Sequence, residues 1–96
     1  MAAYVIYEGQ VLDSERYEEY KVMAAESIKA AGGRYIVRGG EVQGLEGEAP
    51  RGRTVVVEFP DRQAALDWYH GEQYTKARAV RRQAATAVMY VVDGVS

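Results

Sequence analysis

The alternation of hydrophobic and polar positions along the chain predicts four strands. Each has a high content of β-branched and aromatic side chains and is bounded by glycine, proline or acidic residues, as strands and their ends commonly are. The four ranges are 4–11, 34–38, 53–59 and 86–93. Gly39 and Gly40 predict a bulge or sharp bend, after which the second strand resumes through Val42. The glycine-rich residues 44–52 predict an exposed hairpin loop.

The segment after the first strand has the period of a helix. Asp13 is placed to accept hydrogen bonds from the first backbone amides of a helix that begins at residue 14. The apolar side chains that follow fall on one helical face: Tyr17, Tyr20, Ala24, Ile28 and Ala31. Gly32 and Gly33 predict its end, because glycine adopts the left-handed conformation of a helix C-terminus at little cost.

Two further helices are predicted between the third and fourth strands. Pro60 closes the third strand, and Asp61 caps a helix that extends to about His70. Gly71 breaks it, and a short helix over 72–82 leads into the last strand. This β-α-β-β-α-β order predicts one α+β domain over residues 1–96, a ferredoxin-like sandwich whose four-stranded antiparallel sheet has its helices on one face.

The last two strands are apolar on both sides. Val55, Val57 and Phe59 alternate with Thr54, Val56 and Glu58, and Val88, Tyr90 and Val92 alternate with Met89, Val91 and Asp93. Helices can cover only one face of such a sheet, and each large side chain left in water forfeits about 1.5 to 3 kcal/mol. The pattern therefore predicts a homodimer, in which a second copy covers the free face, sheet to sheet.

Composition excludes several classes of partner and chemistry. The formal net charge is -2, which does not favour nucleic acid or an anionic membrane as a partner. The third strand also lacks the aromatic pattern of RNA-recognition domains. The chain has no cysteine and one histidine, so we expect no metal site, and no dinucleotide or Walker loop is present. No secretory signal is found, and we expect a cytoplasmic protein.

The third predicted helix concentrates positive charge. Its four cations lie within seven positions with no acid among them: Lys76, Arg78, Arg81 and Arg82. Two interpretations remain open. Glu58, Asp67 or Glu72 can supply the counter-charge, or Arg78 can bind a carboxylate or phosphate through its planar guanidinium.

Three other residues complete the candidate binding site. Tyr69 and Tyr74 flank the helix break, and Tyr74 lies one helical turn before Arg78, so these side chains can either pack in the core or hold an anionic or enolisable molecule. Arg38 lies in the strand next to Glu58 and can pair with it or line the interior. His70 is not counted among these three residues; it is either a general base or a cation at a helix end.

Many residues along nearly the whole chain resemble those of domain-of-unknown-function family thirteen-thirty. They are Asp13, Tyr17, Tyr20, Gly32, Gly33, the run 34–40, the run 45–47, Arg53, the run 57–60, Ala65, Trp68, Tyr69, Tyr74, Arg78, Asp93 and Gly94. The resemblance implies a ferredoxin-like domain that pairs sheet to sheet as a dimeric α+β barrel. It implies no particular reaction; domains of similar architecture include cofactor-free monooxygenases, muconolactone-type isomerases and haem-handling proteins.

The leading hypothesis is that the dimer binds a small anionic organic molecule between sheet and helices, with any chemistry free of cofactors. Arg38, Tyr69, Tyr74 and Arg78 are the residues expected to line that cleft. The alternative is a non-catalytic dimerisation or ligand-sensing module.

Overall fold

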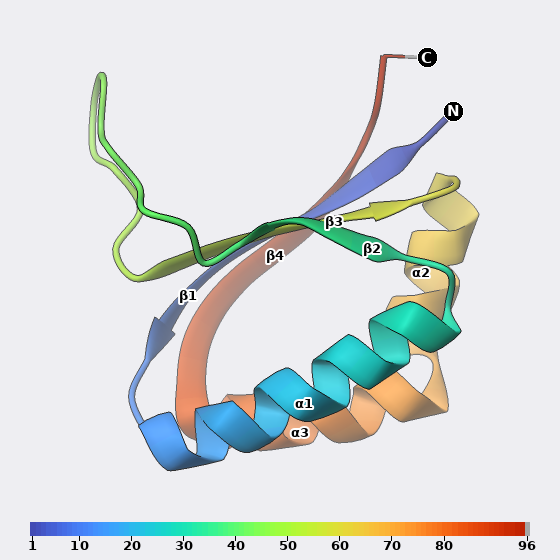
Figure 1. Ribbon diagram of the computed structural model, residues 1–96, viewed down its shortest axis with the longest axis horizontal. Helices are drawn as coiled ribbons and strands as arrows, with labels where there is room; N and C mark the ends of the chain where they lie inside the picture. The colour runs from blue at the N-terminus through green and yellow to red at the C-terminus, as the bar shows by residue number, and fades with distance from the viewer. Residues whose placement is uncertain (96) are drawn as a thin grey trace.

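The computed structural model describes residues 1–95 and places three helices on one side of a four-stranded antiparallel sheet (Figure 1). The elements are β1 (Ala3–Val11), α1 (Ser14–Ala30), β2 (Arg34–Arg38), β3 (Arg53–Phe59), α2 (Arg62–His70), α3 (Glu72–Ala84) and β4 (Ala85–Asp93). The predicted ferredoxin-like fold class is thus confirmed. Within residues 1–95, no helix is both long enough and apolar enough to cross a membrane.

The strands lie in the order β2-β3-β1-β4, and every neighbouring pair is antiparallel. The register aligns side chains in rows across the sheet, because residues opposite one another point to the same face. One row on the helix-covered face, the inner face, is Arg38, Val55, Tyr7 and Met89. One row on the opposite, outer face is Val37, Val56, Ile6 and Tyr90.

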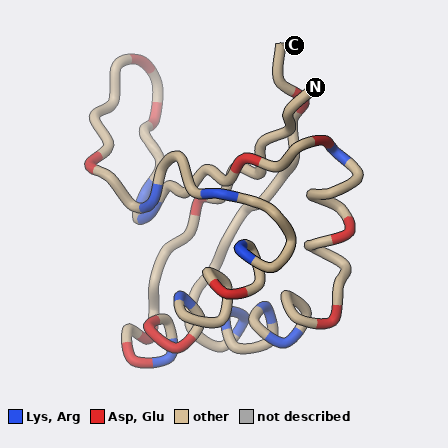
Figure 2. The backbone as a smooth tube through the Cα atoms, turned by 45° about the vertical axis from the view of Figure 1, so that its right-hand side comes forward, with Lys and Arg blue, Asp and Glu red and all other residues tan. Residues whose placement is uncertain are grey.

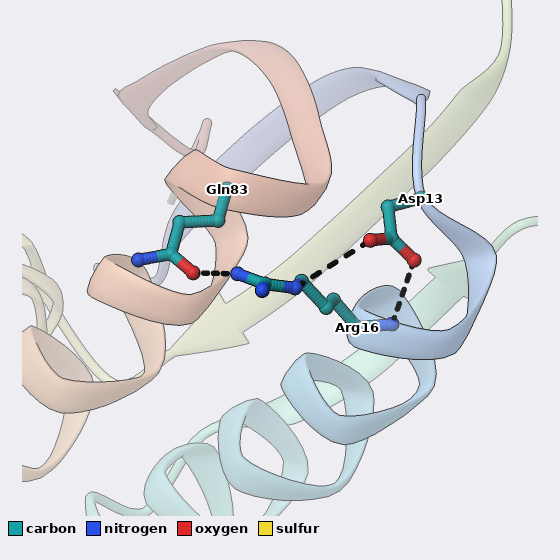
Figure 3. Close-up of polar contacts among 3 residues, drawn as sticks. All are labelled: Asp13, Arg16 and Gln83. Carbon is teal, nitrogen blue, oxygen red and sulfur yellow. Dashed lines mark hydrogen bonds and ion pairs between the residues drawn. The ribbon is translucent and has the colours of Figure 1, made fainter.

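Helix α1 begins as predicted, and its first turn is tied to the end of α3 (Figure 3). The carboxylate of Asp13 accepts a hydrogen bond from the backbone N–H of Arg16, at 3.2 Å. The guanidinium of Arg16 forms an ion pair with the same carboxylate, and its Nη1 donates to Oε1 of Gln83. The cap therefore fixes both the start of α1 and its position beside α3.

Helix α3 continues into β4 without an intervening residue, since one ends at Ala84 and the other begins at Ala85. The carbonyl oxygen of Ala84 accepts two hydrogen bonds, from the backbone N–H of Leu12 at 2.8 Å and of Asp13 at 3.0 Å. The end of β1 and the start of α1 are thus held against this junction.

Trp68 of α2 connects the helices to the sheet in the core. Its ring centroid lies 4.2 Å from that of Tyr74 and 5.4 Å from that of Phe59, two side chains that are fully buried. Its Nε1–H donates to Oγ of Ser27 at 2.9 Å, and that hydroxyl donates to the carbonyl of Ala24 at 2.7 Å. The indole therefore contacts α1, α3 and β3, and its N–H has a hydrogen-bond acceptor within the core.

The prediction that the second strand resumes to Val42 is wrong. β2 ends at Arg38, and residues 39–52 contain no strand. Gly39 has φ of +72° and donates its N–H to the carbonyl of Thr54, which turns the chain out of the sheet. The irregular pairing lies between Tyr35 and Val37, earlier than the predicted bulge.

Glu58 lies on the outer face and pairs with Arg34. The distance from Nε of Arg34 to Oε1 of Glu58 is 2.6 Å, and the Tyr4 hydroxyl donates to Oε2 at 3.2 Å. Of the two alternatives for Arg38, pairing with Glu58 is excluded and a place at the interior is favoured, because Arg38 lies opposite Val55 on the inner face. The hydrogen bond from Arg34 holds the pKa of the Glu58 carboxyl below its ordinary value of 4.5.

We expect Glu58→Gln to reduce the sensitivity of the fold to acid. A carboxylate whose pKa is lower in the folded state contributes stability above its unfolded pKa, and this is lost as the pH falls through the folded value. The difference in free energy of unfolding between pH 6 and pH 3, measured in urea, should be smaller in E58Q. The matched control is Glu48→Gln, in the exposed loop. An unchanged difference in E58Q would contradict the assignment.

Candidate functional site

A narrow cavity of about 30 Å³ lies between the inner face of the sheet and α1. Helix α1 packs mainly on α3, and the side chains of Tyr17 of α1 and Tyr7 of β1 meet across the space between α1 and the strands. Its polar lining consists of four tyrosines and three cations: Tyr7, Tyr17, Tyr20, Tyr35, Lys21, Arg38 and Arg53. The rest is apolar, from residues such as Val5, Val57 and Met89. This volume accommodates about two water molecules.

Two arginines lie at the cavity without an acidic partner. Arg38 and Arg53 come from neighbouring strands on the inner face, near the foot of the β2–β3 loop, where Figure 2 shows basic residues. Among residues 1–95, neither forms an ion pair, and Nε of Arg53 is buried without a hydrogen-bond partner. By contrast, Lys21 reaches Glu18 at 3.0 Å. The unpaired, half-buried guanidinium of Arg53, with the exposed Arg38 beside it, favours a bound anion.

Aromatic rings and a glycine hold these arginines in place. Cζ of Arg38 lies 4.3 Å from the ring centroid of Tyr35, and Cζ of Arg53 lies 5.9 Å from that of Tyr17. A Cβ at Gly39 would collide with the guanidinium of Arg53, so glycine there leaves room for this side chain. The guanidinium of Arg53 is therefore positioned before any ligand arrives, whereas Arg38 is exposed on its tyrosine ring.

Behind the arginines, tyrosine hydroxyls form two buried hydrogen-bonded pairs. Tyr17 of α1 donates to Tyr7 of β1 at 3.1 Å, and Tyr20 of α1 lies 2.9 Å from the hydroxyl of Tyr74 of α3. Burial is the main cause that raises the pKa of Tyr7, Tyr20 and Tyr74 above the ordinary value of 10.0. These phenols are therefore neutral at physiological pH and act as hydrogen-bond donors.

Arg81 of α3 is the buried cation of this cluster, with 8% of its surface exposed. Its positive charge partly offsets the effect of burial on the pKa of Tyr7, Tyr20 and Tyr74. Within residues 1–95 it forms no ion pair, and its Nε has no hydrogen-bond partner. A positive charge is thus enclosed among neutral hydroxyls.

The sequence-predicted site residues lie in two places. Arg78 stacks on Tyr69, with Cζ 4.5 Å from the ring centroid, and that ring lies 5.7 Å from the ring of Tyr74. These three are brought together at the α2–α3 junction. Arg38 lies apart from them, at the cavity beneath β2 and β3. Tyr74 is linked to that cavity through its hydrogen bond with Tyr20.

The positive charge of α3 is only partly offset by the acids named from the sequence. Glu72 reaches Lys76 at 3.7 Å, whereas Glu58 is occupied by Arg34 and Asp67 accepts from Gln63. In Figure 2 the basic residues of α3 run along the lower edge, next to the acidic first half of α1. Of the three acids named from the sequence, Glu72 alone therefore pairs with a cation of α3.

His70 ends α2 and is exposed, with its ring 5.1 Å from that of Tyr69. This is the position expected for a cation at a helix C-terminus. In the described part of the chain, no group of three or more His, Asp or Glu side chains is placed to hold a metal ion.

Sequence reasoning did not single out Tyr7, Arg53 or Arg81 as site residues. A signal for Arg81 was available, because Tyr74, Ala77, Arg81 and Ala84 fall on one face of α3 and are all buried. A charged residue on an otherwise apolar helical face is a candidate for an interior role.

Comparison with solved structures supports the fold. The methylated form of RPA0582, a protein of unknown function from Rhodopseudomonas palustris, has a TM-score of 0.79 at 14% identity, covering 99% of this chain and 82% of that one. SnoaB, a cofactor-independent oxygenase from Streptomyces nogalater, has a TM-score of 0.68 at 11% identity, covering 99% and 94%. At such identities the likeness establishes the fold alone.

A third similar structure is a dimeric ferredoxin-like protein of unknown function from Jannaschia sp. CCS1, with a TM-score of 0.72 at 10% identity, covering 98% of this chain and 100% of that one. No curated protein matches the chain. The family model described as Domain of unknown function (DUF1330) matches residues 2–95. The resemblance noted in the sequence is thereby confirmed, and the protein belongs to this family.

Proposed function

We propose that the protein binds a small anionic organic molecule in the cavity between the sheet and α1. The observation that carries this proposal is the pair Arg38 and Arg53, which approach the cavity from adjacent strands without an acid to neutralise them. A carboxylate accepted by these guanidinium groups would form charge-assisted hydrogen bonds, the stronger kind in proteins. The tyrosine rings and aliphatic side chains then enclose the organic part of the ligand.

Entry of a ligand requires the mouth to widen, because the cavity is small. Arg38 is exposed and Lys21 is half-buried, so both can move outward without disturbing the core. Tyr69 and Arg78 stay outside this cavity in our proposal and support Tyr74 from behind. Any chemistry would be free of cofactors, in keeping with the fold shared with a cofactor-independent oxygenase.

We expect Arg53→Gln to weaken anion binding by roughly 10- to 100-fold, the effect of losing a hydrogen bond from a charged group. The binding assay is a thermal-shift screen of small carboxylates and phosphates. An anion at a hundredfold excess over its Kd stabilises the native state by about 2.7 kcal/mol. For a domain of this size, that raises the Tm by about 10 °C or more.

The matched control is Arg62→Gln, since Arg62 pairs with Asp93 at 2.8 Å, away from the cavity. This variant should keep the affinity of the wild type. If no anion raises the Tm, or if R62Q loses as much affinity as R53Q, the cavity is not an anion site. The alternative, a non-catalytic dimerisation or sensing module, would then be favoured.

We also propose that a second copy covers the outer face of the sheet. The row Val37, Val56, Ile6 and Tyr90 is entirely apolar or aromatic, and Tyr90 and Val88 are 49% and 61% exposed. Two acids flank this row: Glu58, which is paired with Arg34, and Glu8, which lies opposite Val88. An apolar sheet face of this kind can pair with the same face of a second copy across a two-fold axis, and the Jannaschia protein of the same fold is described as dimeric.

A further inference from the structure

A second and larger pocket, which we call the edge pocket, lies between α2 and the edge strand β4. Its volume is about 270 Å³. Val5 and Val91, which lie opposite one another on the inner face of the sheet, line one side, and Ala65 and Leu66 of α2 line the other. The lining extends to the exposed His70 at the end of α2, where the pocket meets solvent.

Short side chains and the edge of the sheet leave this space open. Ala65, Val5 and Val91 are small, and in the sheet of residues 1–95 β4 has a neighbouring strand on one side only. Apolar side chains around such a space lack partner atoms for dispersion contacts and remain in contact with water. A ligand that fills the pocket with apolar atoms therefore gains both contributions.

The lining favours an uncharged, flat ligand. Trp68, with 6% of its surface exposed, supplies an aromatic wall, and Met89 supplies a polarisable thioether; both make favourable contacts with aromatic rings. Among residues 1–95, no Lys, Arg, Asp or Glu lines the edge pocket. A charged ligand would lose hydration there without an opposite charge to replace it. The narrow cavity beside α1 differs in this respect, because three cations line it.

We propose that the edge pocket binds an uncharged aromatic molecule of one or two fused rings. An apolar cavity of about 150 Å³ holds one benzene ring, so the volume of the edge pocket accommodates up to two. A hydroxyl or carbonyl group on the ring would face His70 at the solvent side. This site goes beyond the proposed anion site and does not depend on it, although Val5, Trp68 and Met89 line both spaces and form a common wall.

The probe that tests this is 2-naphthol, which has two fused rings and is uncharged at neutral pH. In a titration followed by methyl NMR, its ring current should shift the signals of Leu66, and the shift should saturate with a Kd of about 1 mM or lower. The other two leucines of the chain, Leu12 and Leu45, are 69% and 94% exposed and do not line the edge pocket. Their signals should stay in place. Ile28 lines the narrow cavity and not the edge pocket, so its signal should also stay.

A second ligand and two variants then test the selectivity and the place of binding. Decahydro-2-naphthol has the same carbon skeleton without the flat π-system, and it should bind the wild type about 3- to 10-fold more weakly. Val91→Phe places a ring in the edge pocket and should weaken 2-naphthol binding by roughly 10- to 100-fold. Val22→Phe, on the exposed side of α1, is the matched control and should bind as the wild type does. Circular dichroism verifies folding, and the wild-type titrations decide the question if V91F does not fold.

Several results would overturn the proposal. If the Leu66 signals do not shift, or if they shift no more than those of Leu12 and Leu45, the edge pocket is not a binding site. If Ile28 shifts while Leu66 does not, 2-naphthol occupies the narrow cavity instead. Equal affinity for decahydro-2-naphthol, or equal effects of V91F and V22F, would show that the edge pocket does not select a flat ring. Anion binding is measured separately by thermal shift, so either proposal can fail without the other.

Discussion

Trp68→Ala is expected to destabilise the fold by about 3 to 5 kcal/mol, the range for truncating a buried aromatic side chain. The indole packs between Phe59 and Tyr74, and its removal would leave a cavity between α2 and β3 and remove the hydrogen bond that the Ser27 hydroxyl accepts. Since domains of this kind have a total stability of roughly 5 to 15 kcal/mol, the loss is about a fifth of it or more. Urea unfolding followed by circular dichroism measures it.

Trp68→Phe separates packing from hydrogen bonding at this position. It keeps an aromatic ring and loses the Nε1–H donor to Ser27, so we expect a smaller loss from the hydrogen bond, about 1 kcal/mol, plus a packing term for the smaller ring. If W68A is destabilised by no more than W68F, the indole does not have the central packing role described above.

Tyr90→Lys is expected to convert the proposed dimer to a monomer at micromolar concentration. The substitution occurs twice in a symmetric interface, and each copy loses the burial of a large side chain, about 1.5 to 3 kcal/mol. The total of about 3 to 6 kcal/mol corresponds to a dimer Kd that is roughly 10²- to 10⁴-fold higher. Light scattering of a dilution series measures the mass.

The matched control is Val22→Lys, because Val22 is 60% exposed on α1, which lies on the other side of the sheet. This variant should keep the mass of the wild type. A wild-type protein that is folded and has the mass of one chain at these concentrations would overturn the proposed dimer. Equal effects of Y90K and V22K would mean that the outer face has no special role.

The elements with a strong local pattern were predicted correctly from the sequence. The face of α1 from Tyr17 to Ile28 is buried as its spacing indicates, and Asp13 caps the helix. β3 and β4 alternate as expected, which places Val57 inside and Val88 outside. In these segments local propensity and tertiary burial favour the same structure.

Features that depend on pairing between distant segments were not predictable in the same way. The end of β2 at Arg38 depends on the turn at Gly39 and the carbonyl of Thr54. The register then decides that Glu58 faces Arg34 on the outer face while Arg38 faces inward. A shift of one residue would have exchanged these roles, and local sequence alone does not determine it.

The site depends on such pairing to an even greater degree. Tyr7, Tyr20 and Arg81 come from a strand and two helices, and each has an ordinary local environment in the sequence. The hydrogen-bonded tyrosine pairs, Tyr17 with Tyr7 and Tyr20 with Tyr74, form because α1 packs on α3 and has few direct contacts with the strands. The cationic helix was identified from the sequence, but which of its arginines is buried follows from helix packing.

The direct passage from α3 into β4 restricts where the length of the chain can vary. One residue inserted between Ala84 and Ala85 would either rotate the inner face of α3 by about 100° or exchange the two faces of β4. Insertions in the exposed residues 39–52 carry no such penalty, since closing a longer loop costs little. Among family members, we therefore expect insertions and deletions to collect in that loop beside the cavity mouth, and the helix–strand junction to keep a constant length.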